Sequence, residues 1–156
     1  PAGLDVAGTD SGAARLVRVP VIGDWIWHVF GRGILLGDPQ YDESALAPAF
    51  RLQGDVTRQM DFRGYGPALL STLRHFPMSD RERLFRTVAE KTDIPVMAVF
   101  GDQDATVNIT SAAKLIALVP RADVRIIEGG THGLNYQRHT EVNPILLEWL
   151  SPDRAD

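Results

Sequence analysis

Two short loop sequences in the last third of the chain carry residues that could share proton-transfer chemistry. The first is Gly101-Asp102-Gln103-Asp104, and the second is Glu128-Gly129-Gly130-Thr131-His132-Gly133. A carboxylate that accepts a hydrogen bond from an imidazole fixes the tautomer of the ring and stabilises its charged form, so that the other ring nitrogen can act as a general base. An Asp of the first loop and His132 could form such a pair if the fold brings the loops together.

Each loop follows a segment that predicts a β-strand. Residues 94–100 (IPVMAVF) form a short apolar run, which is typical of a parallel strand covered on both faces. Residues 123–128 (DVRIIE) have charged ends and an internal Arg, which favours a place nearer the edge of a sheet. A helix capped by Thr110 or Ser111 and ended by Pro120 is expected between the two strands.

This order of elements makes a geometric prediction. Two strands of one sheet that are joined by a crossover helix run parallel, and the crossover is nearly always right-handed. The two loops therefore open on the same edge of the sheet, where open α/β sheets usually build their sites. A closing helix over about residues 140–150 would complete a βαβα unit, and glycine on both sides of His132 would leave its ring unshielded.

The pattern of strand, G-x-x-D turn, helix, strand, G-x-x-H turn and final helix resembles the C-terminal part of the α/β-hydrolase superfamily of serine hydrolases. Residues 95–104, 129–133 and 142–150 carry the resemblance. It implies an α/β fold class, namely the C-terminal portion of an α/β-hydrolase fold in which a helical lid is followed by βαβα. It also implies that Asp104, rather than Asp102, is the catalytic acid and that His132 is the catalytic base.

The first half of the chain predicts short helices separated by glycine and proline. Apolar stripes at helical spacing run through Ile22, Trp25, Ile26, Val29 and Phe30, through Leu69, Leu70, Leu73 and Phe76, and through Leu84, Phe85 and Val88. A capping box of Ser79 and Glu82 is expected to start the third helix. On the family resemblance, residues 1–78 are the lid and its connections, with lid helices from about Asp10 to Phe76, and residues 79–156 are the α/β core portion.

Four apolar residues are candidates for substrate binding. They are Trp25, Trp27 and Phe30 in the first helical stripe and Leu134 just beyond His132. Aromatic residues in such helices more often pack the core or the lid, but on the lid interpretation at least one of them should face the pocket. Leu134 could line the same cleft or support the histidine loop.

The nucleophile of the family is missing from the sequence. In the family it lies in a G-x-S-x-G elbow ahead of the acid and the histidine. No serine here has glycine two positions before and two after it, and there is no H-G-G-G-like oxyanion loop. The resemblance implies Ser-His-Asp hydrolysis of a small ester or related acyl substrate, with Asp and His supplied by this chain and the serine by a missing N-terminal half. The N-terminal half of the same hydrolase, or a second copy of this chain by strand exchange, would complete the sheet, and the fragment alone would be inactive.

Composition argues against several other classes of protein. A net charge of −4 does not favour nucleic-acid binding. The sequence has no apolar run of about 18 residues, so it predicts no membrane-spanning helix. The chain has no cysteine, and no pair of histidines has the i, i+4 spacing of a helical metal site, so no metal is expected. The triad chemistry needs no cofactor. Without a signal-peptide pattern or cysteines, a cytoplasmic location is expected.

Two other interpretations stay open. The same fold could serve as a non-catalytic ligand-binding or receptor-like module, which an elbow serine elsewhere in the protein would argue against. Alternatively, the chain could be a self-contained α/β domain that assembles by strand exchange, with the Asp–His pair purely structural. A stable isolated monomer would contradict the need for additional strands.

Overall fold

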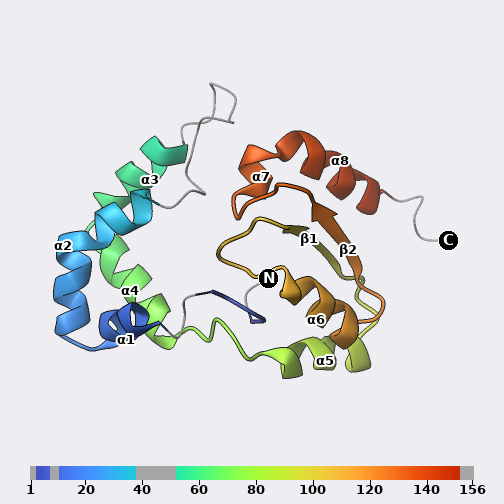
Figure 1. The fold of residues 1–156 in the computed structure, drawn as a ribbon, viewed down its shortest axis with the longest axis horizontal. Coiled ribbons are helices and arrows are strands. Elements are labelled where there is room, and N and C mark those ends of the chain that lie inside the picture. The colour runs from blue at the N-terminus through green and yellow to red at the C-terminus, as the bar shows by residue number, and fades with distance from the viewer. Residues whose placement is uncertain (1–2, 8–10, 38–51, 152–156) are drawn as a thin grey trace.

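The computed structural model describes residues 3–7, 11–37 and 52–151, which form two groups of elements (Figure 1). The first group, called here the helical part, consists of α1 (Gly12–Arg18), α2 (Ile22–Leu36), α3 (Leu52–Met60) and α4 (Tyr65–His75). The second group, called the α/β part, contains α5 (Glu82–Lys91), β1 (Met97–Gly101), α6 (Thr110–Leu118), β2 (Asp123–Ile127), α7 (Leu134–Gln137) and α8 (His139–Trp149). Residues 3–7 also lie against the α/β part.

The two strands pair in parallel, as the sequence predicts. The register runs from Met97 opposite Asp123 to Gly101 opposite Ile127, and α6 makes the crossover. The α/β class and the parallel sheet are thus confirmed. The first strand is shorter than the apolar run over 94–100, because Pro95 has no N–H to donate to a ladder.

Helices cover the two strands on both faces, with α6 on one side and α8 on the other (Figure 1). The main core cluster, on the α6 side, consists of Leu4, Phe100, Val107, Ala112, Leu115 and Val119. The second cluster, on the α8 side, consists of Ile127, Leu134 and Val142, with Val99 and Ile145 packed against it. Because neighbouring side chains of a strand point to opposite faces, Phe100 and Val99 join different clusters.

The N-terminal segment 3–7 is built into the α/β part. The Leu4 side chain is 1% exposed, and Val6 forms an antiparallel bridge with Val107. The Asp5 carboxylate lies 2.6 Å from Lys114 Nζ and accepts a hydrogen bond from the Thr110 hydroxyl at 2.9 Å. Residues 3–7 therefore pack with the elements that follow residue 78, and the division of the chain at that residue stays a prediction.

In the helical part, α2 presents the predicted apolar stripe to the outside. Trp25 and Phe30 are 62% and 53% exposed. The opposite side of α2 faces α4, to which it is tied by two hydrogen bonds from the Arg74 guanidinium to the Asp24 carboxylate at 3.0 and 3.1 Å. The stripe correctly predicts a helix, but it does not identify the side that packs within the described residues.

The caps predicted for two helices are wrong. Helix α5 has Arg81 as its N-cap and no side-chain cap bond, because Asp80 has a φ of +60° and cannot belong to the helix that a Ser79 cap would begin. The Arg81 N–H donates to the Gly3 carbonyl at 2.7 Å. Helix α6 has Ile109 as its N-cap, and the Asn108 side chain accepts from the Thr110 N–H at 2.9 Å. The Ser111 hydroxyl instead accepts from the Asp5 N–H at 3.1 Å.

The closing helix α8 begins at His139 and ends at Trp149, close to the predicted range of 140–150. Pro144 lies inside it, one turn beyond the first-turn position that proline prefers. Among the described residues, no helix combines the length and apolar character that crossing a bilayer requires.

The burial of Leu4 predicts a large effect on stability. Leu4→Ala should lower the free energy of unfolding by about 2–5 kcal/mol, because it leaves a cavity between the N-terminal segment and the core. Leu147→Ala is the matched control, since this side chain is 70% exposed and its loss should cost within about 0.5 kcal/mol. Urea denaturation followed by circular dichroism measures both. Equal effects of the two substitutions would contradict the packing of residues 3–7.

Candidate active site

The two candidate loops lie at the same edge of the sheet, beyond the carboxyl ends of β1 and β2 (Figure 1). Asp104 follows the last residue of β1 by three positions, and His132 lies in the turn between β2 and α7. The parallel register is what brings them to one place. This juxtaposition was expected from the order of elements alone.

The two side chains are hydrogen-bonded to each other. His132 Nδ1 lies 2.9 Å from Asp104 Oδ2. The carboxylate is 10% exposed, whereas the imidazole is 35% exposed. With Nδ1 held by the carboxylate, the ring nitrogen Nε2 is the one left for proton exchange.

Asp104 is held on its other oxygen by the backbone. Oδ1 accepts from the N–H groups of Thr106 and Val107 at 2.7 and 2.8 Å, which is the local turn geometry that aspartate favours. Burial taken alone raises the pKa of the Asp104 carboxyl. The hydrogen bonds from the Val107 N–H, the His132 ring and the Thr106 N–H lower it and outweigh burial, so that the pKa lies below its usual value. Asp104 is therefore ionised near neutral pH and can stabilise a protonated imidazole.

The acid loop and the histidine loop also touch through their backbones. The Gln103 N–H donates to the Gly130 carbonyl at 2.9 Å. A Cβ on Gly101 would lie 2.1 Å from that same carbonyl oxygen, and a Cβ on Gly130 would lie 2.9 Å from the Ile127 carbonyl oxygen and 3.1 Å from Gly101 Cα. Glycine is thus required at both positions for the loops to approach this closely.

The N-terminal segment contributes to the site in a way that the sequence does not signal. The Ala7 N–H donates to the Thr106 carbonyl at 2.7 Å, and the Asn108 N–H donates to the Asp5 carbonyl at 3.1 Å. These bonds flank the two amides that bind Asp104. No local pattern in residues 3–7 points to this pairing, because the partners lie about a hundred positions further along the chain.

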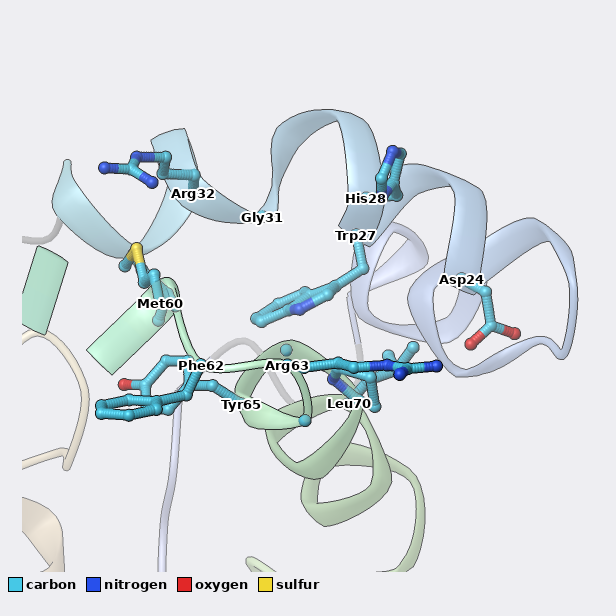
Figure 2. Close-up of a pocket in the computed structure, with 14 residues that line it drawn as sticks. Asp24, Trp27, His28, Gly31, Arg32, Met60, Phe62, Arg63, Tyr65 and Leu70 are labelled. Carbon is cyan, nitrogen blue, oxygen red and sulfur yellow. The ribbon is translucent and has the colours of Figure 1, made fainter. Parts of the chain in front are cut away.

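A cavity of about 540 Å³ lies in the helical part, between α2 and α4 (Figure 2). It is lined by Asp24, Trp27, His28, Gly31, Arg32, Leu35, Met60, Phe62, Arg63, Gly64, Tyr65, Gly66, Pro67 and Leu70. Figure 2 shows the Trp27 indole directed into this space, with Arg63 and Tyr65 on the far side. The ring is fixed closely, because a Cβ on Gly31 would lie 2.9 Å from Trp27 Cδ2 and a Cβ on Gly66 would lie 3.1 Å from Trp27 Nε1.

The other candidate substrate residues lie elsewhere. Trp25 and Phe30 are on the outer side of α2, where their rings meet edge to face with centroids 6.2 Å apart. Leu134 is buried with Ile127 and Val142 below the histidine loop. Only Trp27 of the four lines the described cavity, and neither Asp104 nor His132 is among the lining residues of that cavity.

The part of the chain that the structure describes holds no group of three or more His, Asp or Glu side chains arranged to bind a metal ion. The hydrogen-bonded pair at this edge of the sheet offers one carboxylate, Asp104, and one imidazole, His132. On their own, these two groups can take up and return a proton, but the described residues at this edge present no serine beside them.

Comparison with known proteins gives several matches, although no family model matches the chain. A protein of Synechocystis sp. (strain ATCC 27184 / PCC 6803 / Kazusa) that is named as a non-heme chloroperoxidase is 34% identical over 67 residues, which are 42% of this chain and 24% of that protein. A bromoperoxidase structure from Bacillus anthracis is similar with a TM-score of 0.62 and 26% identity, over 90% of this chain and 49% of that one.

Two further structures share the fold. An esterase from Rhodococcus sp. ECU1013 has a TM-score of 0.55 and 18% identity, over 95% of this chain and 49% of the esterase. An epoxide hydrolase variant from Bacillus megaterium has a TM-score of 0.59 and 19% identity, over 90% of this chain and 51% of the epoxide hydrolase. The chain spans about half the length of these solved structures and about a quarter of the chloroperoxidase.

The lowered pKa of Asp104 predicts a pH-dependent contribution to stability. A carboxyl whose pKa is lower in the folded state stabilises the fold above its unfolded pKa, and loses this effect as the pH falls through the folded value. Asp104→Asn should therefore reduce the free energy of unfolding by about 1–2 kcal/mol at neutral pH. The difference between wild type and variant should shrink below about pH 4, where aspartate in the unfolded chain becomes protonated.

Denaturation with urea at a series of pH values measures this difference. The comparison with the variant is needed because the pKa values of Asp5, Asp24 and Glu141 are lowered as well, by Lys114, Arg74 and Arg138 respectively. A difference that stays constant down to about pH 3 would show that ionised Asp104 adds nothing to the fold.

Proposed function

We propose that this chain, which has the C-terminal portion of the α/β-hydrolase fold, supplies the acid and the base of a Ser-His-Asp hydrolase acting on a small ester or related acyl substrate. The resemblance to this superfamily that the sequence indicates is confirmed by the esterase, bromoperoxidase and epoxide hydrolase structures. The observation that carries the proposal is the hydrogen bond of 2.9 Å between His132 Nδ1 and Asp104 Oδ2.

In the proposed reaction, His132 Nε2 takes the proton from a serine hydroxyl as the serine oxygen attacks the acyl carbon. The same nitrogen then gives the proton to the leaving alcohol, and repeats the exchange with water when the acyl-enzyme is hydrolysed. Asp104 stays ionised throughout and stabilises the protonated ring. The serine, and the donors that stabilise the oxyanion, are proposed to lie in the N-terminal half of the same hydrolase.

The surface of the α/β part supports the need for such a partner. Within the described residues β1 pairs only with β2, although its sequence is apolar on both faces. An apolar groove beside it is lined by Pro95, Val96, Met97, Val99, Leu146, Trp149 and Leu150. Parallel sheets of two strands are not stable alone, so further strands are proposed to complete the sheet.

The helical part is proposed to act as the lid, with residues 1–78 as lid and connections and residues 79–156 as the catalytic portion. Of the candidate substrate residues, Trp27 has the best support, because its ring is fixed against Gly31 and Gly66 and enters a cavity with Met60 and Tyr65. This cavity is proposed to receive the apolar group of the substrate.

A second activity has a specific observation in its favour. The chloroperoxidase and the bromoperoxidase share 34% and 26% identity with this chain over the matched residues, so the peroxide-dependent halogenation that their names imply is the second candidate reaction. A non-catalytic binding module on the same fold is the alternative in a different class. An assay for ester hydrolysis and an assay for bromination with hydrogen peroxide, run on the same preparation, separate the three.

The proton-transfer role is tested by His132→Ala in the complete protein that carries this chain. Hydrolysis of p-nitrophenyl esters should fall by about 10⁴-fold or more in kcat, because the serine loses its base. His75→Ala is the control, since this imidazole is exposed at the end of α4 and should leave the rate unchanged. The 156-residue chain alone should show no turnover. Turnover by the chain alone, or a His132→Ala variant as active as wild type, would refute the assignment.

The role of the cavity is tested by Trp27→Ala. Removal of the indole should raise KM for esters of long or branched acyl groups by about tenfold and leave acetyl esters almost unaffected, because a lost apolar contact is worth on the order of 1–3 kcal/mol. Trp25→Ala is the matched control in the same helix, on its outer side. Equal changes in the two variants, or no change with acyl size, would remove Trp27 from the substrate site.

A further inference from the structure

One peptide group in the histidine loop is held from both sides by charged side chains. It is the peptide that joins Glu128 to Gly129. Its N–H donates to Asp102 Oδ1 at 2.7 Å, and its carbonyl oxygen accepts from Arg138 Nη1 at 3.2 Å. The two side chains come from different elements, since Asp102 follows β1 and Arg138 lies between α7 and α8.

The orientation of this peptide decides the course of the turn. Gly129 has a φ of +66°, the left-handed region that residues with a Cβ rarely adopt. The next residue, Gly130, enters the close contact with Gly101. A rotation of the peptide would break both charge-assisted bonds and change the backbone angles of Gly129, three residues before His132.

We propose that Asp102 is a positioning residue, which, together with Arg138, locks the peptide between residues 128 and 129 and thereby holds His132 against Asp104. The inference rests on the proposed function only in that His132 is taken as the base. It assigns separate roles to the two carboxylates of the acid loop: Asp104 binds the imidazole, and Asp102 binds the backbone that carries the imidazole.

The charges of Asp102 and Arg138 strengthen the hold on the peptide between residues 128 and 129. A carboxylate accepting from a backbone N–H, and a guanidinium donating to a backbone carbonyl, make stronger and better-directed bonds than neutral groups. Arg138 is itself fixed, because its Nε donates to the Glu141 carboxylate at the start of α8. The lock therefore joins the acid loop, the histidine loop and the start of α8 through side chains that do not touch the reacting groups.

The structural half of the proposal is tested by NMR on the complete protein that carries this chain. Asp102→Ala should abolish the protection of the Gly129 amide against hydrogen exchange and weaken the low-field proton resonance of the His132 ring N–H. Asp102→Asn keeps an acceptor oxygen at the same place and should retain both signals. Arg138→Gln should reproduce part of the loss from the other side of the peptide. Asp93→Ala, an exposed carboxylate of the loop before β1, is the matched control.

The functional half is tested in the complete protein with p-nitrophenyl esters. Asp102→Ala should lower kcat by about tenfold to a hundredfold with KM changed by less than about twofold, because a base displaced by about 1 Å loses catalysis rather than binding. Asp102→Asn should recover most of the rate. The double variant Asp102→Ala/Arg138→Gln should be no slower than the slower single variant, since both side chains hold one peptide.

The outcomes are distinguishable. If Asp102→Ala folds and keeps both the His132 resonance and the wild-type kcat, the positioning role is overturned. If Asp102→Ala does not fold, Arg138→Gln decides. Unchanged NMR signals and an unchanged kcat in Arg138→Gln would then overturn the positioning role. A changed His132 resonance in Asp102→Ala, together with a complete wild-type protein that lacks hydrolytic activity, would refute the proposed function and leave the positioning role of Asp102 in place. Loss of stability with kcat unchanged would make Asp102 purely structural and would also overturn the inference.

Discussion

The parallel pairing of β1 with β2 is the constraint on which the rest of the α/β part depends. Because the strands are parallel and paired from Met97 opposite Asp123 to Gly101 opposite Ile127, the loops that follow them leave the sheet at the same edge. Antiparallel pairing, or a longer offset between the strands, would carry Asp104 and His132 apart whatever their side chains did. The hydrogen bond between them is therefore a consequence of topology first and of local chemistry second.

Topology alone would leave the two loops too loosely placed for a bond of 2.9 Å. The additional restraint comes from several directions. Gly101 and Gly130 allow the loop backbones to touch, two backbone amides fix the free oxygen of Asp104, and residues 5–7 brace the turn that supplies those amides. These contacts act on the carboxylate and on the backbone of the two loops, and the imidazole itself remains 35% exposed.

The sequence predicts the features that depend on short patterns and misses those that depend on distant partners. The apolar run before Gly101, the G-x-x-D and G-x-x-H turns and the helical stripes identify the elements and their order. The caps of α5 and α6 could not be predicted, because no local pattern signals the left-handed φ of Asp80 or the hydrogen bond from the Asp5 N–H to the Ser111 hydroxyl. The packing side of α2 was equally hidden, since it is set by Gly31 and Gly66 around Trp27 rather than by the most apolar face.

The contacts that orient Asp104 all come from this chain. The described hydrogen bonds to the Asp104 carboxylate come from Thr106, Val107 and His132, and the bracing segment 3–7 lies in the same chain. The hydrogen bonds that orient the acid–base pair thus come from this chain, whereas the sheet that carries the pair is proposed to need further strands. The proposed hydrolase would then consist of the Asp104–His132 pair from this chain and a nucleophilic serine from the N-terminal half. Its sheet would be continued from the edge of β1 that is unpaired in the described structure, where β1 and the apolar groove beside α8 have surface left to bury.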